Sequence, residues 1–405
     1  MRLSTKGVRR WTAEIGRPEL AFLSMLTAGH LVVHWYANLL SLALPFIKDY
    51  LGLTVFQVGT IVTVQMGVSS GIFIVSGFLA DSFRHRSAAI VSGAVVSFGL
   101  AFFVIGVSPS YGWTLVGVGL VGLGTALWHP PAMRALSLRF PDRRGTALSI
   151  HGVGASVGDA IGPIIVGAII LVADWKLVLE LHLIPALVIA FLLWRGLGMM
   201  REVGGARITL GAYTAGIRTL FADRQVLAVM VSNALIQMGR LSVLAFFPIY
   251  IKETLDYSAF VLGVYLALLY VMGTVSQPVL GVLSDRIGRK AILVPSFACM
   301  GLLYMAIVVA PAGVLLGLVV GALGMFFYAI LNITHTAIMD VAPEGVQAST
   351  MGVMALFTLP FTVASPMFAG YLVTEFGIMS AFWYAAVAAL LASTILVPIR
   401  FRRTI

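Results

Sequence analysis

The sequence predicts an all-α membrane protein in which twelve transmembrane helices form two parallel repeats of six. The first observation is composition: hydrophobic residues make up 60% of 405, charged residues only 10%, and the mean hydropathy is +1.01. A spanning helix takes about 20 apolar residues, so such a chain has room for about twelve. The second observation is a ten-residue segment at 281–290 that has a degraded copy at 77–86, 204 positions upstream.

Twelve apolar stretches have the length of a membrane span. A backbone in lipid must satisfy its own hydrogen bonds, so each stretch is expected to be a helix. The expected spans are residues 19–46, 54–80, 87–108, 112–137, 145–173, 176–196, 226–251, 258–284, 291–311, 312–338, 346–374 and 377–399. A long polar stretch then divides the chain into an N-terminal six-helix half (1–196), a cytoplasmic linker (197–225) and a C-terminal six-helix half (226–405).

We interpret the net charge of +10 as a signal that orients the protein in the membrane, and not as a sign of nucleic-acid binding. With both termini in the cytoplasm, all but four of the 26 Lys and Arg residues fall on the cytoplasmic side. The exceptions are Lys48, Lys176 and Lys252 outside, and Arg240 within a span. Because basic loops stay in the cytoplasm, we expect an integral protein of the cell (inner) membrane with both termini cytoplasmic. The first apolar stretch is too long for a signal peptide and is expected to remain as a helix.

The two halves align beyond the ten-residue segment. Four matched pairs lie at an offset of 204 or 203 residues: Lys48 and Lys252, Gly59 and Gly263, Pro163 and Pro366, and Gly167 and Gly370. A repeat in which both copies point the same way predicts a ligand site between the halves, near the middle of the membrane.

Polar side chains recur inside four of the spans at the spacing of one helix face. Residues three and four apart share a face, and a charge at the bilayer centre costs roughly 2.5–3.5 kcal/mol, so such groups normally face a cavity. The stripes are Thr27, His30, His34, Asn38 and Ser41; Thr125, Trp128 and His129; Asn233, Gln237 and Arg240; and Tyr328, Asn332 and His335. Each residue alone could instead join two helices, but four stripes favour a substrate site.

Arg240 is the strongest single candidate in these stripes. A guanidinium stays charged and has to find an anion or water. We therefore expect it to bind an anionic group on a substrate, and the alternative is that it neutralises a buried acid.

The fifth span carries His151 and Asp159 among regularly spaced glycines. Asp159 is the one acid that we place in the middle of a span. We expect Asp159, His151 and His34 to take part in proton coupling, since imidazole titrates near working pH; Asp159 could instead only bond a neighbouring helix. Three glycines share one face and would let another helix approach closely: Gly154, Gly158 and Gly162.

The repeated segment is similar to a loop of the major facilitator superfamily of secondary transporters. It reads GVLSDRIGRK at 281–290 and GFLADSFRHR at 77–86. The resemblance covers nearly the whole chain and implies two six-helix halves with helices 1, 4, 7 and 10 around a central cavity, where the four stripes fall. It also implies an inner lock that gates the cytoplasmic side, formed here by Asp81, Arg84, Arg86, Asp285, Arg286 and Arg289. The first copy departs from the pattern, since Ser82 and Arg84 replace a basic residue and a glycine.

Within the superfamily the chain resembles the fosmidomycin resistance group. The resemblance rests on Gly29-His30, on Leu44-Pro45, on Trp128-His129-Pro130 and on the glycines of the fifth span, which look like an antiporter motif. Three residues depart: His34 stands at an acid position, Pro131 at a Glu position, and Val118 where many drug exporters have Arg. The usual carboxylate–arginine proton relay is therefore not intact.

These features predict a proton-coupled transporter that exports a small anionic or zwitterionic drug or metabolite by antiport, as in antibiotic resistance. The alternative is uptake of a metabolite by proton symport. A transition-metal carrier ranks lower, because no carboxylate or thiol cluster accompanies the histidines, and a non-transporting sensor would need a large soluble appendage. The sequence contains no nucleophile–base pair of the kind that an enzyme would use, so we do not expect an enzyme. We expect a monomer in the lipid bilayer, with protons and a small molecule as ligands and with no cofactor, bound metal or nucleic acid.

Overall fold

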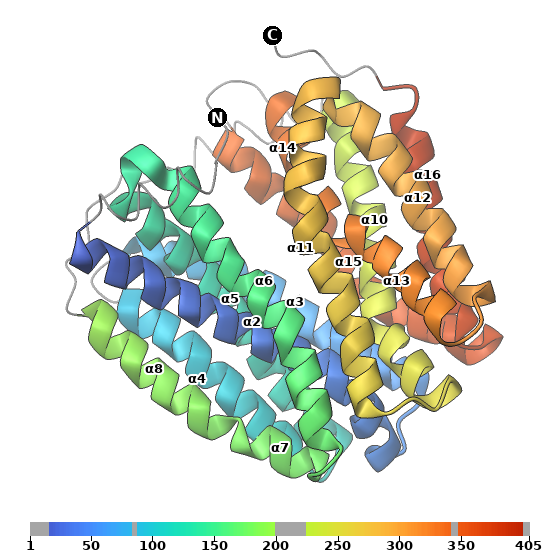
Figure 1. Cartoon of the computed structure of the whole chain (residues 1–405), viewed down its shortest axis with the longest axis horizontal. Coiled ribbons are helices and arrows are strands. Elements are labelled where there is room, and N and C mark those ends of the chain that lie inside the picture. Colours follow the sequence, from blue (N-terminus) through green and yellow to red (C-terminus); the bar gives the residue numbers. More distant parts are fainter. Residues whose placement is uncertain (1–15, 83–86, 199–223, 342–346, 400–405) are drawn as a thin grey trace. The chain divides into compact units, whose positions relative to one another are not determined.

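The computed structural model describes residues 16–82, 87–198, 224–341 and 347–399, and this part of the chain contains helices and no strands (Figure 1). Twelve segments of it are long and apolar enough to cross a membrane, which confirms the predicted fold class. The α-helices are α2 Arg17–Leu51, α3 Val55–Ser82, α4 Ser87–Gly106, α5 Tyr111–Arg139, α6 Arg144–Ile170, α7 Trp175–Leu181, α8 Leu183–Gly198, α10 Arg224–Ile249, α11 Ala259–Ile287, α12 Arg289–Val309, α13 Val314–Phe327, α14 Ala329–Val341, α15 Gln347–Phe376 and α16 Met379–Leu396.

Two of the predicted spans are interrupted. The span expected at 176–196 consists of α7 and α8, which meet at His182, and the span expected at 312–338 consists of α13 and α14, which meet at Tyr328. At the first break the backbone carbonyl of His182 accepts a hydrogen bond from the Tyr36 hydroxyl at 2.5 Å. The same carbonyl also accepts a hydrogen bond from the backbone N–H of Ala186, so the contact with Tyr36 is added to the helical hydrogen bond at this break.

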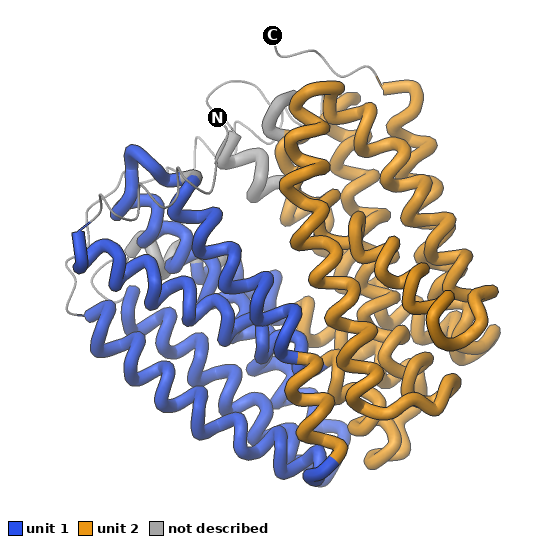
Figure 2. The backbone as a smooth tube through the Cα atoms, in the orientation of Figure 1, with its two compact units in different colours: residues 1–40, 68–162, 172–207 blue, residues 41–67, 163–171, 208–405 orange. Residues whose placement is uncertain are grey.

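The described chain forms two compact units (Figure 2). Unit 1 comprises residues 1–40, 68–162 and 172–207, and unit 2 comprises residues 41–67, 163–171 and 208–405. Unit 2 thus holds α10 to α16 together with the end of α2, the beginning of α3 and the end of α6. The sequence-predicted halves, 1–196 and 226–405, remain a prediction.

Within unit 2, the sequence repeat has a counterpart in helix packing. Gly59 on α3 lies against the carbonyl of Pro366 on α15, and Gly263 on α11 lies against the carbonyl of Pro163 on α6. A Cβ atom on either glycine would overlap that carbonyl. A second pair of contacts repeats in the same way, with Gly370 against Val55 and Gly167 against Ala259. Residues matched by the repeat therefore make matched contacts.

Large apolar side chains lie outside as well as inside. The cores contain fully buried aromatic rings, among them Phe98 and Trp128 in unit 1 and Phe246 and Phe382 in unit 2. Many Val, Leu, Ile and Phe side chains are nonetheless exposed, which in a water-soluble protein would create large apolar patches. This surface suits the hydrocarbon of a bilayer, in agreement with an integral membrane protein.

Candidate transport site

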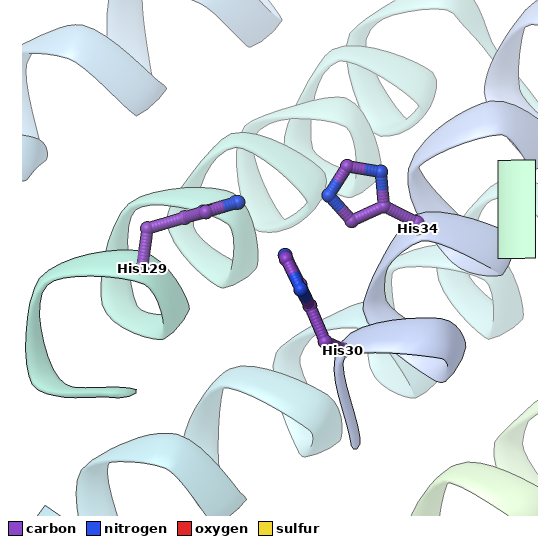
Figure 3. A group of neighbouring side chains, drawn as sticks. All are labelled: His30, His34 and His129. Carbon is purple, nitrogen blue, oxygen red and sulfur yellow. The ribbon is translucent and has the colours of Figure 1, made fainter. Parts of the chain in front are cut away.

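Four histidines gather in unit 1. His30 and His34 lie on α2, His129 on α5 and His151 on α6. The His30 ring stacks on that of His151 with centroids 4.0 Å apart, and it meets the edge of His34 at 4.6 Å and of His129 at 5.4 Å. The rings of His30, His34 and His129 point toward a common space (Figure 3). The structure thus brings together residues that the sequence placed on three separate spans.

The glycines of α6 allow this gathering. A Cβ atom at Gly154 would overlap the carbonyl of Thr27, and one at Gly158 would overlap the carbonyl of Leu31, so α6 lies directly against α2. Gly162 continues the contact at Trp35. The predicted close approach is present, and its partner is the helix that carries His30 and His34.

Close packing of α2 and α6 places Asp159 at the polar stripe of α2. The Oδ1 atom of Asp159 lies 2.8 Å from Nδ1 of His34 and also accepts a hydrogen bond from the amide of Asn38. The side chains of His34 and Asp159 are 26% and 14% exposed. His34 and Asn38, which the sequence assigned to substrate binding, therefore both contact the same carboxylate oxygen of Asp159, the predicted proton carrier. The pairing itself could not be predicted, because it depends on the rotation of two helices.

Trp128 packs against the histidines and is not exposed on a cavity surface. Its side chain is fully buried, and its ring stacks on His30 and His151 at centroid distances of 6.2 and 6.3 Å. Gly29 lies against the same ring, where a larger residue would overlap it. Trp128 was a candidate for substrate contact, and its surroundings suit a packing role.

Arg240 lies buried in unit 2, with 5% of its surface exposed. Its guanidinium donates a hydrogen bond to the Gln237 side chain one turn earlier on α10. The Cζ atom lies 4.7 Å from the centre of the Phe327 ring and 4.6 Å from that of Tyr328, where α13 ends. Attraction between a cation and an aromatic face stabilises this arrangement. Phe327 was not predicted, because an aromatic residue in an apolar run carries no polar signal.

The charge of Arg240 is not neutralised by an ion pair with any described residue. The ion pairs seen in the described ranges join His34 to Asp159, Lys48 to Glu253, Arg139 to Glu19 and Arg289 to Asp285. Two buried atoms on the same face of α10 also lack a hydrogen-bond partner in the described structure, namely Nε of Arg240 and Oδ1 of Asn233. The stripe of Asn233, Gln237 and Arg240 therefore offers a donor and an acceptor with which a ligand could form hydrogen bonds.

The third stripe is divided by the break at Tyr328. Tyr328 contacts Arg240, whereas Asn332 lines a pocket of about 310 Å³ together with Asp285 and Arg289. His335 is half-buried further along α14.

The gating residues are described only for the second copy of the repeated segment. Asp285 and Arg289 form an ion pair four residues apart, and Arg289 also donates to the hydroxyl of Ser284 at 2.6 Å. Arg286 is exposed on the last turn of α11, and the helix ends at Gly288, where φ is +97°. Asp81 lies on the last described turn of α3, but its side chain is outside the described residues, as are Arg84 and Arg86. The lock remains a prediction.

Comparison with known families decides the class of protein. A family model of the Major Facilitator Superfamily matches residues 26–359 and 229–404. The chain belongs to this superfamily. Members of the superfamily are transporters, so the protein is a transporter and not an enzyme.

Individual relatives are distant. The chain is 26% identical to the Fosmidomycin resistance protein of Escherichia coli (strain K12) over 154 residues, which cover 38% of this chain and 37% of that protein. It is 27% identical to the Probable sulfoacetate transporter SauU of Cupriavidus necator over 367 residues, or 84% and 83% of the two chains. Among solved structures, a bacterial homologue of the human lysosomal transporter Spinster has a TM-score of 0.73 at 16% identity, covering 95% of this chain and 96% of that one. This likeness concerns the fold.

Proposed function

We propose that the protein is a proton-coupled secondary transporter that exports a small anionic or zwitterionic organic compound by antiport. The observation that carries the substrate class is the buried guanidinium of Arg240. A cation removed from water is costly unless an anion or hydrogen-bond acceptors replace the lost hydration. Gln237 supplies one acceptor, and no carboxylate among the described residues pairs with the charge. A carboxylate, phosphonate or sulfonate on the substrate completes the site.

The surroundings of Arg240 favour a compact organic anion. The rings of Phe327 and Tyr328 hold the guanidinium in place, so its remaining N–H groups are presented in a fixed direction. Arg can bind a carboxylate or phosphonate with two parallel hydrogen bonds, which a lysine ammonium cannot do. The amide of Asn233 on the same helix face offers a further polar contact.

Two relatives support the direction and the class. One is a fosmidomycin resistance protein, and resistance conferred by a transporter is consistent with export. The other is a probable sulfoacetate transporter, and sulfoacetate carries two acidic groups. Proton coupling is supported by the position of Asp159 within a candidate span, where it contacts His34 and Asn38 and lies on the same helix as His151. Both termini are proposed to be cytoplasmic in an inner membrane, with a monomer as the transporting unit.

Binding to Arg240 variants tests the proposal. We would measure binding of a panel of anionic, zwitterionic and neutral compounds, including phosphonates and sulfoacetate, to the purified protein by calorimetry. Arg240→Lys should weaken binding of the anions that the native protein binds, and Arg240→Ala should weaken it about tenfold or more, as expected for loss of charged hydrogen bonds worth about 1.5–3 kcal/mol.

Arg195→Ala is the matched control, because Arg195 is exposed near the end of α8. Gel filtration of each variant checks that it is folded. A well-folded Arg240→Ala protein that binds the same anion with unchanged affinity would contradict the proposal.

A further inference from the structure

We propose that His30, His34 and His129 form a binding site for one divalent first-row transition metal ion in unit 1. One ring nitrogen from each residue lies within 4.8 Å of the other two (Figure 3). Three convergent imidazoles on two helices, α2 and α5, are a sufficient protein ligand set for a metal ion that keeps one position open. This inference goes beyond the proposed transport function, and its test measures metal binding rather than transport.

The hydrogen bonds of the three rings identify Nε2 as the candidate ligand atom of each ring. Nδ1 of His30 lies 3.0 Å from the carbonyl oxygen of His151, and Nδ1 of His129 lies 3.0 Å from the carbonyl oxygen of Thr125. Nδ1 of His34 lies 2.8 Å from the carboxylate of Asp159. A carbonyl or carboxylate oxygen accepts hydrogen bonds, so each Nδ1 carries the proton. Each neutral ring then has its lone pair on Nε2.

The Nε2 lone pair of His30 needs a positive partner. His30 is 7% exposed, and its Nε2 is buried without a hydrogen-bond partner in the described structure. A single water molecule has two hydrogens, so it could serve at most two of three lone pairs. A metal cation serves all three at once, which is why the arrangement fits an ion better than a bridging water.

The spacing requires only a small adjustment. At a zinc–nitrogen distance of about 2.0–2.1 Å, tetrahedral geometry puts ligand nitrogens about 3.4 Å apart. Ring nitrogens that now lie within 4.8 Å of one another reach that separation through side-chain rotations that move them by about 1 Å. The hydrogen bonds at Nδ1 already fix the orientation of each ring, and Asp159 gives His34 the carboxylate–histidine arrangement that orients many metal ligands.

The donor set selects the ion. Imidazole nitrogen suits Zn²⁺, Co²⁺, Ni²⁺ and Cu²⁺, whereas Mg²⁺, Ca²⁺ and Mn²⁺ prefer oxygen ligands and Cu⁺ prefers thiolates. The only cysteine of the chain, Cys299, belongs to unit 2. The sequence led us to expect no metal site, because no carboxylate seemed to accompany the histidines; Asp159 does accompany them, as the partner of His34.

Metal binding to the purified, tag-free protein tests the inference. Equilibrium dialysis against Zn²⁺, with metal counted by mass spectrometry, should give one ion per chain. His30→Ala and His129→Ala should each weaken binding at least tenfold. Asp159→Asn should weaken it about 10–100-fold, the usual effect of removing an orienting partner. His182→Gln is the matched control, because His182 bonds Trp35 and Val178 outside the trio, and it should bind Zn²⁺ as the native protein does.

The spectrum of Co²⁺ gives an answer that does not depend on the folding of any variant. Native protein loaded with Co²⁺ should show the intense visible absorption of a tetrahedral or five-coordinate site with nitrogen ligands. A spectrum equal to that of aqueous Co²⁺, or Zn²⁺ binding that is equal in the native protein, the His129→Ala variant and the His182→Gln control, would overturn the proposal.

Discussion

At the scale of single residues, two polar groups inside candidate spans differ in how many partners they find within the protein. The carboxylate of Asp159 accepts hydrogen bonds from His34 and Asn38, so its surroundings satisfy it. The guanidinium of Arg240 has one acceptor in Gln237, two aromatic faces and no ion-pair partner in the described chain. The first group finds its partners within the protein, and we propose that a ligand supplies the partner of the second. This difference is the reason for assigning substrate binding to Arg240 rather than to Asp159.

Asp159→Asn tests the proton-coupling role. Asn keeps the shape and can still accept hydrogen bonds, but it cannot carry an exchangeable carboxyl proton. We expect the variant to lose accumulation driven by a pH gradient while it keeps exchange of labelled for unlabelled substrate in proteoliposomes. Asp174→Asn is the control, because it makes the same acid-to-amide change at an exposed residue that caps α7. If Asp159→Asn retains full pH-driven accumulation, the proton role belongs elsewhere, with His30 or His34 the next candidates.

Sequence reasoning identified the polar residues of both candidate sites but not their neighbours. His34, Asp159 and Arg240 were identified because polar groups are rare inside spans and recur at helical spacing. The ring of Phe327 against Arg240 had no such signal. Trp128 shares a helix face with candidate residues, yet it is fully buried, because side chains on one face of a helix can meet a neighbouring helix instead of a cavity.

At the scale of helices, glycine positions decide how closely the elements approach. Gly59 and Gly263 each lie against a proline carbonyl, and the repeat relates the two contacts. A proline inside a helix removes one backbone hydrogen bond from the preceding turn, which favours a bend near the point where the glycine packs. The matched pairs seen in the sequence thus acquire a physical explanation as helix-crossing points.

Gly59→Ala and Gly71→Ala separate packing from helix propensity. Both glycines lie on α3, but a Cβ atom at Gly59 would overlap Pro366, whereas nothing lies within 4 Å of one at Gly71. Ala stabilises a helix interior by about 1 kcal/mol relative to Gly, so Gly71→Ala should leave the Tm unchanged or raise it. Gly59→Ala should lower the free energy of unfolding by about 1–3 kcal/mol through overpacking. Thermal unfolding in detergent measures both, and equal Tm values would refute the crossing point.

The two helix breaks could not be predicted from the sequence. His182 and Tyr328 lie within apolar runs that satisfy the length of a span, and neither is a proline or glycine. The carbonyl of His182 serves Tyr36, and the ring of Tyr328 serves Arg240. Each break thus coincides with a tertiary contact, which a local sequence pattern does not contain.

At the scale of the whole molecule, hydrophobicity and the repeat were sufficient for the fold class. Every predicted span corresponds to a helical segment long enough to cross a membrane, with ends that differ by up to eight residues. Composition determines this class because a lipid environment permits few backbone solutions. Substrate and direction are different, since members of one fold carry unrelated compounds and only the site chemistry distinguishes them.

Orientation is open to a direct labelling experiment. In a Cys299→Ala background, cysteines introduced at Ser110 and Arg207 would be treated with a membrane-impermeant thiol reagent. Ser110 is exposed between α4 and α5, and Arg207 lies in the predicted linker. The distribution of Lys and Arg predicts that, in intact cells, Ser110→Cys reacts and Arg207→Cys does not. Reaction at position 207 from outside would invert the proposed topology.

Coupled movement of protons and substrate tests the central claim most directly. Purified protein would be reconstituted into liposomes containing a pH-sensitive dye, and an anion that binds in an Arg240-dependent manner would be added outside without a pH gradient. Antiport predicts that inward movement of the anion drives protons out, so the internal pH rises, and that Arg240→Ala abolishes the rise. Internal acidification on addition of substrate would show symport, and transport without a change in internal pH beyond that of protein-free liposomes would contradict proton coupling.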